Sequence, residues 1–215
     1  MSRISLITLI AAMVFMLAGC ARTVEVRPMF PEPVLEPYPL DVGIRYPEDQ
    51  ENFTHKEDPQ LEPEWTIRLG AANREMLQTV FDKMFRGTVE LTADSTTNND
   101  QLDLIIEPRL EELEFEVPHQ SGTDQYVVWL RYTMMLETPD SGHLGDWKIT
   151  GYGQEDEGRM GLGAKEAMRE ATITALRDAA ANIIVDFLNA PGISDQVLLT
   201  RGDAEGEKDH SDNLQ

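Results

Sequence analysis

The side chains that could carry chemistry in this chain do not form a recognisable catalytic or metal-binding motif. No two of the four histidines have the spacing of metal ligands, and all four fall in predicted loops or in the tail: His55, His119, His143 and His210. No Gly-x-Ser-x-Gly motif occurs. The only cysteine, Cys20, has no partner for an internal disulfide. We therefore expect no catalysis, no bound metal and no cofactor.

The residues before Cys20 have the order of a secretory signal peptide. Arg3 supplies the basic residue, residues 4–17 form an apolar run, and small residues stand directly before the cysteine. At about 1.5 Å per residue this run is shorter than the ~30 Å hydrocarbon layer, so it does not predict a permanent membrane span. We predict that residues 1–19 are a signal peptide, cleaved between Gly19 and Cys20.

The stretch Leu17-Ala18-Gly19-Cys20 resembles the lipobox of bacterial lipoproteins. The resemblance implies that acyl chains such as palmitate are attached to the Cys20 thiol, and that the new amino group is acylated after cleavage. Two or more chains hold a protein stably on a bilayer, since each buried methylene contributes about 0.8 kcal/mol. Ala21, not aspartate, follows the cysteine. By the enterobacterial sorting rule, this implies an outer-membrane lipoprotein that faces the periplasm.

The charge balance limits the partners. The chain has 39 acidic and 18 basic residues, a net charge of −21. Such a surface repels nucleic acid and anionic lipid headgroups, so we expect neither to bind through a basic face. Contact with the membrane is instead expected through the lipid on Cys20. The acidic residues are spread along the chain, which favours simple solubility, with a cationic partner or divalent ions as the alternative.

Composition divides the rest of the chain into three parts. Residues 20–39 contain the expected lipidated cysteine and a proline-rich tether, in which prolines oppose sheet pairing and favour extended backbone. Residues 40–192 have the length of one ordinary domain. Residues 193–215 form an acidic tail that we expect to be disordered.

Hydrophobic periodicity predicts the elements of this domain. Strands are expected at 40–46, 65–69, 88–92, 102–117, 126–138 and 146–152, with loops at 47–63 and 151–163. Pro108 predicts a bulge inside 102–117. Helices are expected at 71–86, closed by Gly87, and at 164–188, closed by Pro191 and Gly192. Alanines along the second helix predict close packing on a sheet. The expected fold class is α+β, a mainly antiparallel sheet with two helices packed on one face.

The order of these elements behind a lipobox is similar to that of small outer-membrane lipoproteins, such as YajG-type proteins and the lipopolysaccharide-assembly lipoprotein LptE. The matching stretches are residues 69–73, which follow a strand, the strand 102–108 and the alanine-rich helix 164–188. For the LptE type the resemblance implies a β-barrel partner. It carries no binding residue over to this chain.

The glycine-rich segment 158–163 lies before the second helix but does not match a phosphate-binding loop. Its order is Gly-x-x-Gly-x-Gly, it lacks the Gly-Lys-Ser/Thr of a P-loop, and the acidic residues 155–157 precede it. We interpret it as a flexible entry to the helix.

These observations predict a lipid-anchored periplasmic accessory protein of the cell envelope that binds a protein partner without catalysis. The candidate contact residues are the aromatics Trp65, Trp147 and Tyr152. The alternative is an envelope-lipid or transport auxiliary lipoprotein, which would bind an acyl chain or a lipid between the alanine-rich helix and the sheet.

Overall fold

The computed structural model describes residues 21–27, 30–59, 63–92, 101–140, 142–158 and 163–197. In this part of the chain eight strands form two sheets, one of five strands in the order β5-β2-β6-β7-β8 and one of three in the order β1-β4-β3. The predicted α+β class is confirmed. The signal peptide and the lipobox, with Gly19 and Cys20, lie outside the described residues.

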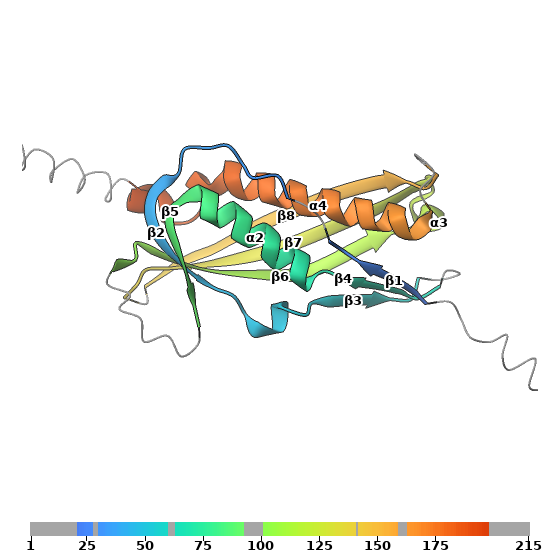
Figure 1. Ribbon diagram of the computed structural model, residues 1–215, viewed down its shortest axis with the longest axis horizontal. Helices are drawn as coiled ribbons and strands as arrows, with labels where there is room; N and C mark the ends of the chain where they lie inside the picture. Colours follow the sequence, from blue (N-terminus) through green and yellow to red (C-terminus); the bar gives the residue numbers. More distant parts are fainter. Residues whose placement is uncertain are drawn as a thin grey trace, which may run out of the picture.

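Three long antiparallel strands make up most of the large sheet (Figure 1). They are β6 (Leu104–Glu116), β7 (Gln125–Glu137) and β8 (His143–Asp156). The short helix α3 (Pro118–Ser121) and Gly122, at a φ of 68°, make the turn between β6 and β7. Beyond β6, β2 (Tyr38–Arg45) pairs in parallel with both β6 and β5 (Phe85–Leu91). The sheet is therefore mainly antiparallel, with two parallel pairs at one side.

The small sheet corrects two expectations. Its strand β1 (Arg22–Glu25) lies inside the expected tether and pairs in parallel with β4 (Trp65–Arg68). Val24 is buried there, and the strand ends before Pro28, so the prolines of this segment do not interrupt its pairing. On the other side of β4, β3 (Thr54–Glu57) pairs antiparallel inside the expected loop 47–63.

The chain between β1 and β2 also lies on the domain. Phe30 and Leu35 pack against the hydrophobic core, and Nζ of Lys83 lies 2.9 Å from a carboxylate oxygen of Glu32. A free polyproline tether over residues 21–39 is therefore wrong for the described part of that segment. Two short 3-10 helices, η1 (Glu48–Gln50) and η4 (Phe187–Asn189), also lie in the described part of the chain.

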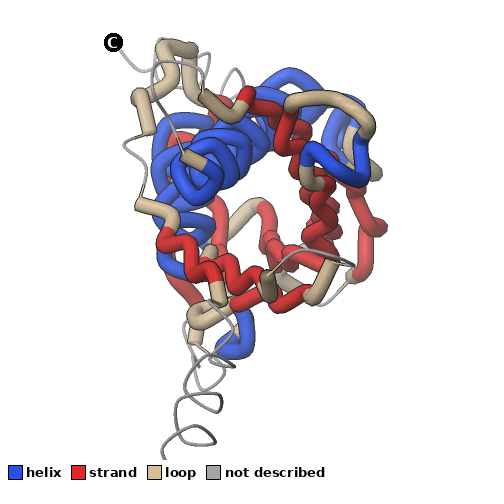
Figure 2. The backbone as a smooth tube through the Cα atoms, turned by 90° about the vertical axis from the view of Figure 1, so that its right-hand side faces the viewer, coloured by secondary structure: helices blue, strands red, loops and turns tan. Residues whose placement is uncertain are grey.

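Two long helices cover one face of the large sheet, as predicted (Figures 1 and 2). Helix α2 (Gly70–Met84) buries the apolar face that the sequence marks, at Met76, Leu77, Val80, Phe81 and Met84. Gly87 does not close this helix. The chain turns directly from Met84 into β5, where Gly87 lies opposite Asp41 of β2.

Helix α4 (Ala164–Asp186) lies on β8 at very close range. A Cβ atom added at Gly153 would come within 2.0 Å of the carbonyl oxygen of Ala171, and one added at Gly151 within 2.3 Å of that of Ala175. The predicted packing of alanines on a sheet is thus confirmed. The two glycines belong to β8 and not to the expected loop 151–163, because the strand continues to Asp156.

The irregularity in β6 lies two to four residues after the expected one. The register against β7 shifts between Leu110 and Glu112, whereas Pro108 pairs regularly with Met134. Pro108 is tolerated because the pairing of β6 with β2 ends at Ile106, so the missing N–H removes no bond to β2.

The first residues of the expected disordered tail are ordered. After a turn at Gly192, whose φ is 73°, residues 193–197 are helical, and both Ile193 and Val197 are buried in the core. Apolar side chains at spacing four can share one helical face, which explains why this segment packs. The rest of the predicted tail, 198–215, lies outside the described residues.

Candidate functional site

Two of the three aromatic residues proposed as partner contacts are buried. Trp65 has no exposed surface, and its ring packs edge-on against Phe115 and Tyr126, with centroids 6.3 and 5.8 Å away. Trp147 is 4% exposed. The prediction that Trp65 and Trp147 contact a partner is therefore wrong, because both side chains fill the space between layers. Tyr152, the third candidate, is 42% exposed.

Trp147 is held by a polar contact at its buried indole. Its Nε1 donates a 2.9 Å hydrogen bond to Asp186 of α4, and the amide of Asn189 donates another to the same carboxylate. The hydrogen bond from Trp147 and then that from Asn189 hold the pKa of Asp186 below its usual value. This contact ties β8 to the C-terminal end of α4.

Helix α4 also satisfies the backbone at the free edge of the large sheet. The N–H of Tyr152 donates to Asp178 at 2.9 Å, and Nδ2 of Asn182 donates to the carbonyl oxygen of Thr150 at 3.0 Å. Asp178, Asn182 and Asp186 are spaced by four residues, so they lie along one stripe of the helix. The stripe covers the edge of β8 and fixes the backbone from which Tyr152 projects.

The outer face of the sheet, opposite the helices, presents an exposed aromatic pair. Trp129 of β7 lies directly across from Tyr152 of β8, with ring centroids 5.8 Å apart and ring planes inclined by 55°. Trp129 is 36% exposed. On the other side of Trp129 the register places Glu114 of β6, so one row across three strands is carboxylate, indole and phenol.

Trp129 was not among the sequence candidates, although the sequence contains the signal. Strand β7 buries its even-numbered residues from Tyr126 to Leu136, so alternation places Trp129 on the opposite face. The run of β-forming residues in this strand hides that alternation, because Val127 on the outer face is also apolar and buried.

A shallow hollow of about 320 Å³ lies beside this aromatic pair. Its lining comes from all three long strands: Glu112, Glu114, Glu116, Trp129, Leu130, Arg131 and Thr150. Arg131 forms an ion pair with Glu112. In the part of the chain that the structure describes, Glu114 and Glu116 have no ion-pair partner. The hollow therefore combines an aromatic wall with two carboxylates that lack a cation.

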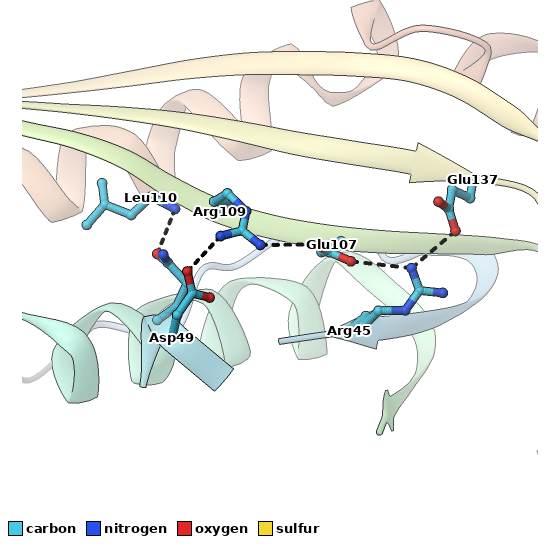
Figure 3. Close-up of polar contacts among 7 residues, drawn as sticks. Arg45, Asp49, Glu107, Arg109, Leu110 and Glu137 are labelled. Carbon is cyan, nitrogen blue, oxygen red and sulfur yellow. Dashed lines mark hydrogen bonds and ion pairs between the residues drawn. The ribbon is translucent and has the colours of Figure 1, made fainter. Parts of the chain in front are cut away.

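At the opposite end of the same face each carboxylate of the cluster contacts an arginine (Figure 3). Arg45 of β2 contacts Glu107 and Glu137 at 3.4 and 3.2 Å, while Arg109 contacts Asp49 at 2.8 Å and Glu107 at 3.6 Å. The side chain of Gln50 accepts a 3.0 Å hydrogen bond from the N–H of Leu110, beyond the end of β2. These contacts fasten η1 and β2 to the long strands, so this end is structural.

A second concave region lies between the two helices. Residues 30–33 line one side of a mainly apolar groove of about 240 Å³. On the helices α2 and α4 it is lined by Met76, Thr79, Val80, Arg177, Ala180, Ala181 and Ile184. The acyl-chain hypothesis placed the ligand between α4 and the sheet. At Gly151 and Gly153 that interface has no room even for a methyl group, whereas the groove between the helices is open.

The remaining sequence candidates do not gather into a site. His55 contacts Glu57 at 3.1 Å, His143 contacts Asp146 at 3.6 Å, and His210 lies outside the described residues. Within the described ranges no three His, Cys, Asp or Glu side chains are placed to hold a metal ion. Four residues of the glycine-rich segment, 159–162, are not described. None of the helices in the described part of the chain is long and apolar enough to span a bilayer.

Comparison with known proteins identifies no family. No family model matches the chain, and no curated protein matches it. A Xanthomonas campestris protein of family DUF330 is 12% identical, with a TM-score of 0.45 over 76% of this chain and 91% of that one. A Helicobacter pylori protein described as a candidate homologue of a neuraminyllactose-binding hemagglutinin is 10% identical, with a TM-score of 0.46 over 85% of this chain and 100% of that one.

A candidate lipoprotein of Caulobacter crescentus is 11% identical, with a TM-score of 0.36 over 62% of this chain and 83% of that one. At these identities and scores the likenesses carry no inference about function.

Proposed function

We propose that this chain is a lipid-anchored accessory protein of the bacterial cell envelope, which binds a protein partner through the outer face of its large sheet without catalysis. The exposed pair Trp129 and Tyr152 carries the proposal. Large aromatic side chains are enriched where proteins bind one another, and here two of them lie side by side, partly exposed, next to a hollow.

The anchor is supported by the sequence Leu17-Ala18-Gly19-Cys20 at the end of an apolar run. Mass spectrometry of the protein from its own cells tests it. We expect a chain that begins at Cys20 and carries acyl mass, recovered with the outer membrane. A Cys20→Ser variant should leave the outer-membrane fraction. A bare thiol on Cys20, or a retained residue 1–19 segment, would overturn the anchor.

Partner binding is tested by photo-crosslinking in the same cells. A photoreactive amino acid at Thr150, which lines the hollow, should yield a discrete adduct with an envelope protein. The matched control is the same amino acid at Gln78, which is exposed on α2, and it should not yield that adduct. Absence of any protein adduct at Thr150, or an equal adduct at Gln78, would contradict the proposal.

The groove between the helices favours a second candidate, an auxiliary protein that binds an acyl chain or a lipid. Its lining is mainly apolar and includes residues 30–33. Native mass spectrometry of the Cys20→Ser variant should then show a copurified lipid, which Ala180→Trp should displace by filling the groove. If the unsubstituted groove carries no lipid, this second candidate fails.

A further inference from the structure

The exposed aromatic pair has the geometry of a surface that attracts a cation. The faces of tryptophan and tyrosine rings attract guanidinium and ammonium groups within about 6 Å of the ring centroid, and tryptophan is the best of the aromatic residues. Trp129 and Tyr152 stand at 5.8 Å from one another, so a cation beside one ring is near the other. Both rings are partly exposed and can be reached from solvent.

The carboxylates beside the pair add the matching charge. Glu114 lies directly across from Trp129, and Glu116 follows on the same face of β6, at about 7 Å along the strand. Arg131, the basic residue that lines the hollow, already forms an ion pair with Glu112. At the Arg45 end each carboxylate of the cluster thus contacts an arginine, whereas at the Trp129 end Glu114 and Glu116 have no ion-pair partner among the described residues.

The protein fills a similar arrangement elsewhere with one of its own arginines. The guanidinium of Arg74 lies over the ring of Tyr46, at 4.3 Å from its centroid, and donates hydrogen bonds of 2.7 and 2.6 Å to the two carboxylate oxygens of Glu90. The aromatic face and the carboxylate of Glu90 hold the planar guanidinium, and Glu51 lies 3.7 Å from it on another side. Trp129 and Glu114 offer the same two groups in adjacent strands, without an arginine between them.

From this comparison we infer that the hollow beside Trp129 and Glu114 binds an arginine side chain from a basic segment of the partner protein. The inference rests on the proposed function and names the partner's chemistry. The carboxylates repel phosphate, so an anionic lipid headgroup or a nucleic acid does not fit this surface. Arginine fits better than lysine, because its guanidinium can stack on the indole and at the same time donate two hydrogen bonds to a carboxylate.

The probe is a fluorescent peptide with the sequence Gly-Arg-Gly-Arg-Gly, measured by anisotropy against the full chain in detergent. We expect saturable binding that weakens as salt is raised. The double variant Glu114→Gln and Glu116→Gln should weaken binding by about tenfold or more, and Trp129→Ala should weaken it to a similar degree. The same peptide with citrulline in place of arginine keeps the size and loses the charge, so it should not bind.

The control variant is Glu75→Gln with Glu170→Gln, which removes the same charge from the two helices. It should change the affinity by less than about twofold. Equal losses in the two double variants, or equal binding of the citrulline peptide, would overturn the inference.

In cells, an adduct at Thr150 that persists undiminished in the Glu114→Gln and Glu116→Gln variant would overturn the inference while leaving the proposed function in place. Loss of the adduct in that variant alone supports both.

Discussion

The backbone N–H of Tyr152 donates a 2.9 Å hydrogen bond to the carboxylate of Asp178 in α4. Helix α4 therefore fixes the backbone of the residue whose ring lies on the outer face of the sheet. One turn further along the helix, Asn182 donates to the carbonyl oxygen of Thr150 at 3.0 Å. These two side chains occupy backbone groups that an added strand would otherwise pair with. The helix therefore both covers the edge of β8 and sets the position of the aromatic pair.

Loss of these side chains should expose the edge of β8. An unprotected edge presents unpaired N–H and C=O groups to other chains. We expect the double variant Asp178→Ala and Asn182→Ala to self-associate in a concentration-dependent way, as measured by light scattering after gel filtration. Asp195→Ala removes the same charge from an exposed position and should elute as the unsubstituted protein does. A double variant that keeps the original mass at all concentrations would contradict this role.

Gly153→Ala should destabilise the domain strongly. The added Cβ would lie 2.0 Å from the carbonyl oxygen of Ala171 and 2.4 Å from the backbone N of Ala175, so α4 must shift away from β8. We expect a loss of about 1–3 kcal/mol or more in the free energy of unfolding, measured by denaturant titration. Thr150→Ala, on the outer face of the same strand, should cost less than about 1 kcal/mol. Similar costs for the two variants would show that α4 is not in close contact with the strand.

Tyr132→Phe should destabilise the domain, because it removes a hydrogen-bond donor from the core. The hydroxyl of Tyr132 donates a 2.7 Å hydrogen bond to Oδ1 of Asn73, and both side chains are buried. Burial raises the pKa of Tyr132, which keeps the phenol protonated as a donor. Removing the donor should cost about 1–3 kcal/mol in the free energy of unfolding, because the Asn73 oxygen remains buried without a partner.

A double-mutant cycle separates that hydrogen bond from packing. Tyr132→Phe combined with Asn73→Leu removes both partners, so we expect it to cost less than the sum of the two single variants. Additive costs, measured in the same denaturant titration, would mean that the two groups do not interact.

The contact between Trp147 and Asp186 predicts a pH dependence of stability. The hydrogen bond from the indole, and then that from Asn189, hold the pKa of Asp186 below the ordinary 3.8. Because the folded-state pKa is lowered, the stabilisation is complete above about pH 3.8 and is lost as the pH falls through the folded-state value. The free energy of unfolding of Asp186→Asn should therefore approach that of the unsubstituted protein as the pH falls below 3.8. A difference that is constant between neutral and acidic pH would contradict the assignment.

Elements with a clear hydrophobic period were predictable from the sequence, and those defined by pairing were not. The apolar stripe of α2 and the alanines of α4 mark helices that pack on a sheet whatever their neighbours are. Strand β3 has the sequence Thr-His-Lys-Glu, which has no apolar alternation, and it forms because β4 offers its edge. Strand β1 belongs to the proline-rich segment 20–39 but ends before its first proline. The proline content of the whole segment does not show this.

The candidate site also has one feature that was predictable from the sequence and one that was not. The type of residue was predictable, since exposed aromatics were expected as contacts, and Tyr152 is one. Which aromatics are exposed depended on the face of each strand and on what covers it. Trp147 projects toward α4 and Phe187, whereas Trp129 projects to the uncovered face.

By itself the sequence determined the α+β class, the two packed helices and the acidic balance of the chain, and it supplies the prediction of a lipid anchor at Cys20. Each of these features depends on the types of residues present and on the spacing of apolar residues over a short stretch of the chain. Only the tertiary structure brought Glu114, Trp129 and Tyr152 into one row, because that row is made by the register of three strands. Register is decided by the packing of every inward-facing side chain at once, so no local pattern contains it.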